Sequence, residues 1–308
     1  MSKNLSTQIS GTRKLALFLF IVFSSSLIIG GLGLIVAHFI THLELSSPIL
    51  SNYNNPDTIL YMKIIQIFQA FGLFVVPPII MAYLYRKETK NYLSFRKTSL
   101  SFIIVSGLII IIALPFINWL AEINQSLSLP ESLKGIEQWM LQNEKAAENI
   151  TRHFLQADGI STLLLNLFIM ALIPAFGEEM LFRGVLQRLI IQISKNIHIG
   201  IWITAFIFSA IHMQFFTFLP RFFMGILFGY MIVWSGSIWL SITAHFINNG
   251  TAIIISYLIQ KGSVNPDIET AGNGNLTALS LSVILIFSGI YFLKSKAINT
   301  NRILQDYF

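Results

Sequence analysis

The sequence predicts an all-α protein, a polytopic transmembrane helix bundle with about eight spans. Hydrophobic residues make up 54% of the 308 residues and charged residues only 11%, whereas soluble domains carry about 25% charge. Apolar runs of roughly 20 residues, the length that an α-helix needs to cross a bilayer, recur along the chain. We expect residues 1–308 to form one integral membrane domain. The predicted spans are about 16–40, 59–84, 100–121, 161–177 (extending past 185 if the helix continues), 198–214, 218–234, 237–259 and 276–294.

The distribution of basic residues predicts the orientation. Lys and Arg cluster before the first span, after the second, between the fourth and fifth and after the last, whereas the loop 41–58 has neither. Because loops rich in Lys and Arg stay in the cytoplasm, we expect both termini there, in a multi-pass protein of the cytoplasmic membrane. The net charge of +6 is spread over these loops, so we expect the lipid bilayer as a partner and no nucleic acid. The clustered residues include Lys3, Arg13, Lys14, Arg86, Lys87, Lys90, Arg96, Lys97, Arg188, Lys195, Lys294, Lys296 and Arg302.

The longest predicted loop, 122–160, is expected outside the cytoplasm with an amphipathic helix in it. Ser128 and Glu131 have the spacing of a capping box, which predicts a helix start at Ser128. Apolar residues from Leu133 to Phe154 recur at helical spacing. Such a helix covers the bundle or lies on the bilayer surface, and a lid that contacts substrate is the alternative.

Three predicted spans contain polar residues that the bilayer would penalise. In the fourth, Glu178 and Glu179 follow the uncharged stretch 161–176, and Glu179 and Arg183 are i, i+4 neighbours in the favourable ion-pair order. Glu178 points about 100° away, so it lacks this partner. The alternative is a charge cluster at a helix end, at the membrane interface.

The fifth and seventh spans carry the histidines. Phe208 and His212 lie one turn apart on one face, as do His245 and Asn249, while Asn248 falls within the same arc as Asn249. Spacing alone does not choose between the two asparagines. The alternatives are a histidine satisfied within the core and polar residues that join helices.

The coincidence of these groups on three helices predicts a hydrolytic site, since the remaining spans contribute almost no polar residues. A histidine beside a glutamate can activate water, and a second histidine with an asparagine amide can stabilise an oxyanion. The chain has no cysteine, which excludes a cysteine nucleophile, disulfides and thiolate metal sites.

The residues Glu178-Glu179-x-x-x-Arg183, Phe208-x-x-x-His212 and His245-x-x-x-Asn249 resemble the CAAX protease and bacteriocin-processing (CPBP or Abi) family of intramembrane glutamate endopeptidases. This family includes the type II CAAX prenyl endopeptidases. Gly225-x-x-x-Gly229 is also similar, and the resemblance covers a catalytic core at about 161–255.

The resemblance implies a role for each matched residue. Glu178 would be the general base that activates water, with His212 assisting. His245 and Asn249 would stabilise the oxyanion, so that the family motif selects Asn249. The supporting residues would be Glu179, Arg183 and Phe208.

The expected function is therefore hydrolysis of a peptide bond in a hydrophobic or lipid-modified, CAAX-like substrate associated with the membrane. No cofactor is expected, and zinc is the alternative. Two observations count against zinc: the sequence has no His-Glu-x-x-His pattern, and the candidate ligands come from three different helices. A non-proteolytic immunity or scaffold protein of the same fold is the second hypothesis. A transporter with a Glu/His proton relay is the third, although no pair of matching broken helices supports it.

Overall fold

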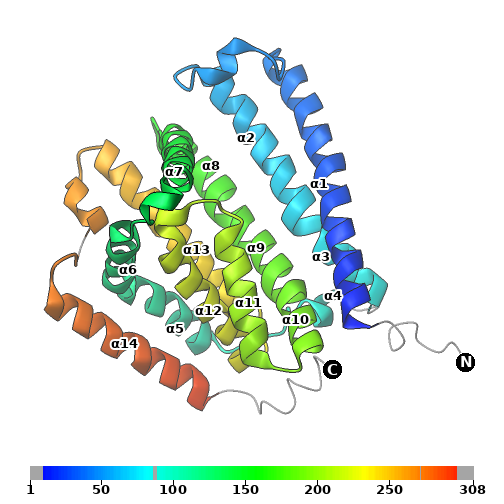
Figure 1. The fold of residues 1–308 in the computed structure, drawn as a ribbon, viewed down its shortest axis with the longest axis vertical. Coiled ribbons are helices and arrows are strands. Elements are labelled where there is room, and N and C mark those ends of the chain that lie inside the picture. The colour runs from blue at the N-terminus through cyan, green and yellow to red at the C-terminus, as the bar shows by residue number, and fades with distance from the viewer. Residues whose placement is uncertain (1–9, 86–88, 271, 297–308) are drawn as a thin grey trace, which may run out of the picture.

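The computed structural model describes residues 10–85, 89–270 and 272–296, and every regular element in these ranges is a helix (Figure 1). The predicted all-α class is confirmed. Lys3, Arg86, Lys87 and Arg302, which entered the orientation argument, lie outside the described residues. The α-helices are α1 Gly11–Thr41, α2 Pro56–Ala70, α3 Val76–Tyr85, α4 Thr89–Tyr92, α5 Leu100–Ile112, α6 Leu114–Ser126, α7 Lys134–Leu155, α8 Ile160–Leu167, α9 Ile173–Glu179, α10 Gln187–Ser194, α11 Ile197–Ala210, α12 Phe218–Ser235, α13 Trp239–Gln260 and α14 Leu276–Ser295.

Within the described residues, six helical units are long and apolar enough to cross a membrane, and the pair α5 and α6, bent by 45°, can form a seventh. The chain is therefore a multi-pass membrane protein, and the predicted number of eight spans is corrected to six or seven. The difference lies at 198–214, where α11 has only 14 residues. Such a helix is about 21 Å long, whereas the hydrocarbon core of a bilayer is about 30 Å thick. The sidedness of the termini stays a prediction.

The bend between α5 and α6 has a local cause. Pro115 is the second residue of α6, and a proline inside a helical run removes one backbone N–H and clashes with the preceding turn. The predicted span 100–121 is thus one sequence run folded as two helices that meet at Ala113.

The helix that carries the two glutamates continues well beyond them. Residues Ile160–Ser194 form one 35-residue unit in which α8, α9 and α10 are joined by two π-helical segments, Phe168–Leu172 and Met180–Leu186. All residues of the second π segment are buried. The 35-residue helical unit continues beyond Glu179, the last residue of α9, to Ser194. The structure therefore contradicts the alternative of a charge cluster at a helix end. Wide π turns inside α-helices are frequent at functional sites.

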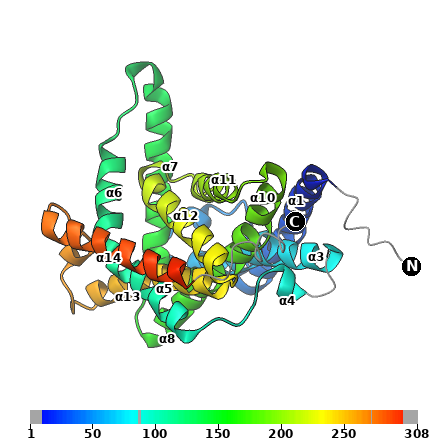
Figure 2. The ribbon, with the colours of Figure 1, turned by 90° about the horizontal axis from the view of Figure 1, so that it is seen from below.

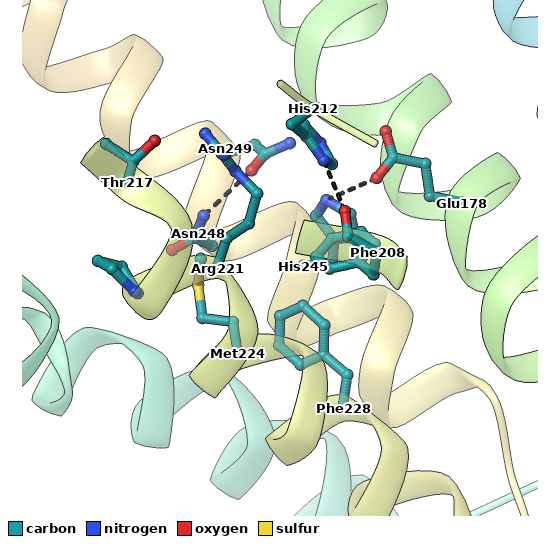
Figure 3. A pocket seen from close by; sticks show the side chains of 11 residues that line it. Glu178, Phe208, His212, Thr217, Arg221, Met224, Phe228, His245, Asn248 and Asn249 are labelled. Atoms are coloured by element: carbon teal, nitrogen blue, oxygen red, sulfur yellow. Dashed lines mark hydrogen bonds and ion pairs between the residues drawn. The ribbon is translucent and has the colours of Figure 1, made fainter. Parts of the chain in front are cut away.

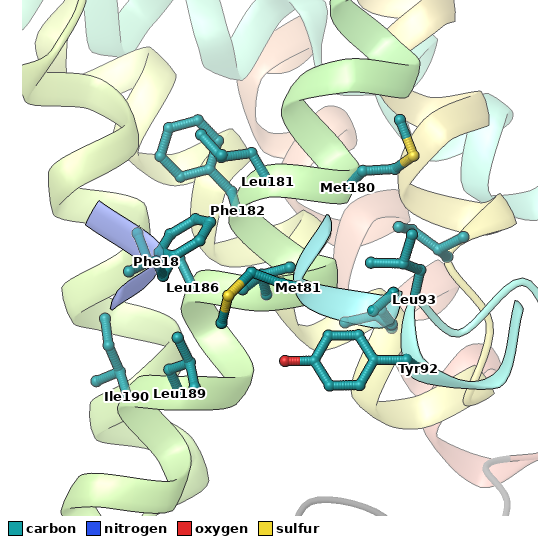
Figure 4. Packing of buried hydrophobic residues seen from close by; sticks show 14 of the residues in the cluster. Phe18, Met81, Tyr92, Leu93, Met180, Leu181, Phe182, Leu186, Leu189 and Ile190 are labelled. Carbon is teal, nitrogen blue, oxygen red and sulfur yellow. The ribbon is translucent and has the colours of Figure 1, made fainter. Parts of the chain in front are cut away.

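The core around this unit is assembled from segments distant in sequence. Phe182, Leu186 and Leu189 pack with Phe18 of α1 and Met81 of α3 in one buried hydrophobic cluster (Figure 4). Leu93 belongs to the same cluster. The packing fixes the helix on which Glu178 and Glu179 lie.

Two polar side chains on this unit bond to two glycine carbonyls on α12. Arg183 Nη2 donates to Gly225 O at 3.2 Å, and one turn later Gln187 Nε2 donates to Gly229 O at 3.2 Å. The same glycines let α12 approach α11, since a Cβ built on Gly225 would lie 2.9 Å from Ala205 Cβ. Small residues four apart permit such close helix contacts in membranes.

Helix α7 runs across the bundle: Figure 1 shows it nearly end-on while α1 and α2 run lengthwise, and Figure 2 shows it along its length. Glu144 of α7 accepts from Phe216 N at 3.3 Å, and Trp139 packs on Phe215 with ring centroids 5.5 Å apart. The predicted helix start at Ser128 is wrong, because the chain forms a 3₁₀ turn at Glu131–Leu133 and α7 begins at Lys134. The backbone N–H of Leu129, next to Ser128, donates to the Glu137 carboxylate at 3.4 Å and not to Glu131.

The close approach at Gly225 is testable. We expect Gly225→Val to destabilise the protein by about 1–3 kcal/mol, because overpacking forces α11 and α12 apart, and to lower the midpoint of thermal unfolding measured by intrinsic fluorescence in lipid nanodiscs. Gly31→Val is the matched control, since no heavy atom lies within 4 Å of a Cβ at Gly31. Equal effects of both substitutions would contradict the packing role.

Candidate active site

A cavity of about 230 Å³ opens between α9, α12, α13 and the C-terminal end of α11 (Figure 3). Each of these elements contributes side chains to the cavity wall. The four residues predicted to be catalytic all line this cavity. The sequence places them far apart, and the fold brings them to one cavity. The lining residues are Glu178, Phe208, His212, Thr217, Pro220, Arg221, Met224, Phe228, His245, Asn248 and Asn249.

The two glutamates have different environments, as the helix spacing predicted. Glu179 is fully buried, and its Oε1 pairs with Arg183 Nη1 at 2.8 Å. Glu178 borders the cavity, and its Oε2 has no hydrogen-bond partner among the described residues. A buried carboxylate with a bonded cation is compensated, whereas one that faces a cavity can bind a further group. Glu178 is thus the carboxylate available for chemistry.

His245 lies between these carboxylates. Its Nδ1 donates to Glu179 Oε1 at 2.9 Å, and its Nε2 lies 3.9 Å from Glu178 Oε2. The ring stacks on Phe228, with centroids 5.5 Å apart and planes at 23°. A separation of 3.9 Å is too long for a direct hydrogen bond and suits a bridging water. His245 is held on one side and faces Glu178 on the other.

His212 is oriented by its own helix. Its Nδ1 donates to Phe208 O at 2.7 Å, so that Nδ1 carries the proton and Nε2 of the neutral ring is an acceptor. The Phe208 ring lies edge-on to His212 at 5.2 Å and to His245 at 6.0 Å between centroids. Arg183 Cζ sits 4.6 Å from the centroid of the same ring. Phe208 therefore packs against both imidazoles and the buried guanidinium.

The imidazole beside Glu178 differs from the sequence-based interpretation. That interpretation placed His212 with Glu178 and His245 with Asn249. Across the described ranges, His245 is the one imidazole within 4.0 Å of a carboxylate oxygen of Glu178. Helix spacing could not reveal this, because it fixes the face of a helix but not the rotation of neighbouring helices.

The two asparagines form a chain of hydrogen bonds at the cavity wall. Asn248 Nδ2 donates to Asn249 Oδ1 at 3.1 Å, and Asn249 Nδ2 donates to Met170 O at 3.2 Å. Each carboxamide has two N–H groups, so each retains one beyond these bonds. Both amides line the cavity, and the geometry, like the spacing, does not choose between them.

Sequence reasoning missed two cations in spans that it treated as apolar. Arg221 of α12 lines the cavity, and its Nη2 donates to Gln214 Oε1 at 2.7 Å. Lys63 of α2 is buried away from the cavity, and its Nζ donates to Asn166 Oδ1 at 2.8 Å. The signal was present, since a single charge inside an apolar span marks a functional or paired group.

Glu178 also borders a second cavity, of about 540 Å³. Its wall is largely apolar and comes from α2, α7 and the α8–α9 unit, with Met62, Ile65, Ile150 and Ile169 among its side chains. Glu178 therefore borders both a polar cavity and an apolar one.

The donor set does not fit the zinc alternative. No group of three or more His, Cys, Asp or Glu side chains in the described part of the chain is placed to hold a metal ion. Glu179 Oε1, which would be a natural ligand, is shared by Arg183 Nη1 and His245 Nδ1.

Comparison with known proteins finds sequence similarity over the segment that carries this site. Residues 160–251 match the family described as type II CAAX prenyl endopeptidase, Rce1-like. The uncharacterized protein YpbD of Bacillus subtilis (strain 168) is 38% identical over 86 residues, which are 27% of this chain and 41% of YpbD. The similarity thus spans less than half of YpbD, and no solved structure matches. The matched segment contains Glu178, His212, His245 and Asn249, and it is a domain of the Rce1-like type II CAAX prenyl endopeptidase family.

Proposed function

We propose that this protein is an intramembrane endopeptidase that hydrolyses a peptide bond in a hydrophobic or lipid-modified substrate at the cytoplasmic membrane. The family match supports a peptide substrate. The observation that carries the proposal is the unpartnered Oε2 of Glu178 at the cavity wall, opposite His245 Nε2 at 3.9 Å. A carboxylate and an imidazole at this separation can hold a water molecule between them.

In the proposed reaction Glu178 is the general base. It takes a proton from water as the water oxygen attacks the scissile carbonyl carbon, and the same proton then goes to the leaving amine nitrogen. The chain needs no covalent nucleophile for this reaction. The acceptor Nε2 of His212 faces the same cavity and orients the water.

In this proposal His245 and Asn249 stabilise the oxyanion that forms on the scissile carbonyl. In the imidazolium form of His245 both ring nitrogens donate, so Nε2–H reaches the oxyanion while Nδ1–H stays bonded to Glu179. Asn249 adds its remaining N–H. Glu179, Arg183 and Phe208 hold His245 in place, and Glu179 and Arg183 do so from outside the cavity.

The first prediction from this proposal concerns Glu178. Loss of a general base lowers the rate by about 10²–10⁴-fold, so we expect Glu178→Gln to abolish the new protein termini that wild-type protein generates in membranes, as detected by mass spectrometry. Glu131→Gln, which removes an exposed carboxylate, is the matched control. Indistinguishable termini from wild type and Glu178→Gln, both folded, would favour the non-proteolytic immunity or scaffold function.

The second prediction concerns the buried ion pair. Removal of one partner leaves an uncompensated buried charge, which costs about 3–5 kcal/mol. We therefore expect Glu179→Gln and Arg183→Met each to lower the unfolding midpoint strongly. The double variant should recover part of that loss while it remains inactive. A double variant as unstable as the sum of the single variants would show that the two side chains act independently.

The third prediction concerns metals. Because the donor set does not fit zinc, we expect cleavage to continue at an unchanged rate after incubation with 1,10-phenanthroline and dialysis. A loss of cleavage that added zinc restores would overturn the metal-free mechanism.

A further inference from the structure

We propose that the distal part of the α1–α2 hairpin, residues 30–70, is a gate that swings away from α7 and α8 and opens the 540 Å³ cavity to the bilayer. The hydrogen bond between Lys63 and Asn166 is the latch that holds this gate closed. The inference rests on the proposed function, because the gate would admit the apolar part of a substrate to Glu178. Neither latch residue belongs to the sequence motifs of the site.

The cavity separates the distal hairpin from the neighbouring helices. In Figure 1 α1 and α2 lie side by side, and they stand apart from α7 and α8 at the end that carries their connecting loop. Met62 and Ile65 of α2 line one side of the cavity, and Ile150 of α7 and Ile169 after α8 line the other. Segments joined by few buried contacts open at the lowest cost in free energy.

The latch is the one hydrogen bond among the described residues that joins α2 to α7 or α8. Lys63 Nζ donates to Asn166 Oδ1 at 2.8 Å and lies 5.9 Å from the centroid of the Phe154 ring of α7. Nearer the loop, the ring centroids of Tyr53 and His153 lie 5.5 Å apart. Opening of the gate would break these contacts.

The latch is only partly satisfied in the closed state. Asn166 is fully buried, and its Nδ2 has no hydrogen-bond partner among the described residues. Lys63 is also buried, and its three N–H donors meet one acceptor in the described part of the chain. A buried polar group without a partner costs free energy, and a lysine that leaves such a site can extend to the bilayer interface. These groups lower the stability of the closed state relative to the open one.

A π-helical segment provides the hinge in α2. This helix ends at Ala70, and the π-helical segment Phe71–Val75 joins it to α3. Pro77 and Pro78 follow, and because proline has no backbone N–H, the carbonyls four residues before them lose their α-helical donors. Helices bend at π turns and at prolines, so α2 can change direction here while α3 stays in the core.

Helix α1 has a weak point at the same level. A Cβ built on Gly72 of the π-helical segment would lie 3.0 Å from Ile29 Cβ of α1, and two consecutive glycines, residues 30–31, come next. Beyond them a Cβ built on Gly33 would lie 2.6 Å from Phe68 Cβ. This close contact indicates that the distal parts of α1 and α2 move as one body.

The hinge lies beside the catalytic carboxylate. Phe74 of the π-helical segment and Glu178 line the same apolar cavity. A hydrophobic chain that enters from the bilayer through the open gate therefore reaches Glu178 without passing through the 230 Å³ polar cavity.

The chain has no cysteine, so spin labels on introduced cysteines can measure the gate. Leu60→Cys on α2 and Leu164→Cys on α8, both at exposed positions, report the gap by double electron–electron resonance of the full chain in lipid nanodiscs. Lys63→Met removes the latch. We expect it to raise the ratio of the longer to the shorter distance about 10–100-fold, the factor for loss of a hydrogen bond to a charged group. Asn166→Asp converts the latch into an ion pair and should lower the same ratio.

Two controls accompany this measurement. Lys134→Met, which removes an exposed lysine on α7, should leave the ratio unchanged. Labels at Leu60→Cys and Ile35→Cys, both on the distal hairpin, should keep one distance in every variant. The inference is overturned if the gap is the same in wild type, Lys63→Met and Asn166→Asp, or if both variants change the ratio in one direction. Asn166→Asp decides alone if Lys63→Met does not fold.

Cleavage connects the gate to the proposed function. With the gate held closed, Asn166→Asp should lower the rate at which new protein termini form about 10-fold or more. An unchanged rate in this variant would refute entry by this route. The distances need no hydrolysis, so failure of the protease proposal would appear separately, as identical termini from wild type and Glu178→Gln.

Discussion

The site depends on the burial of Arg183 beside Glu179. This guanidinium pairs with Glu179 on its own helix, donates to Gly225 O on α12 and packs on Phe208 of α11. Through Glu179 it also fixes His245 on α13. Four helical units are therefore tied to one cation that never reaches the cavity. Breaking a buried ion pair by removing one partner leaves an uncompensated charge, so the arrangement has little freedom to vary.

This constraint explains why the adjacent glutamates have different environments. Side chains one residue apart on a helix diverge by about 100°, so Glu179 enters the buried network while Glu178 reaches the cavity. The charge of Glu179 is balanced within the protein. Glu178 lines the cavity, and its Oε2 is buried without a hydrogen-bond partner among the described residues.

The sequence was sufficient for the helical class, the ion pair between Glu179 and Arg183, and the gathering of polar residues on three helices, because these follow from hydropathy and from the helical repeat. It was insufficient for the length of α11, since the apolar run continues through Ile211 after the helix ends at Ala210. It also missed the proximity of His245 to Glu178, which depends on how α13 is rotated against α9. Arg221 escaped because a single charge has no motif, although its cost in a membrane was a usable signal.

The shortness of α11 has a consequence for the surrounding lipid. Trp202, Ile203 and Phe206 on this helix are exposed apolar side chains, which suit contact with acyl chains. A hydrophobic surface about 21 Å high is shorter than a bilayer core about 30 Å thick, and local thinning is one way in which a bilayer accommodates such a mismatch. His212 lies two residues beyond the end of α11. Such thinning would shorten the path from bulk water to the cavity.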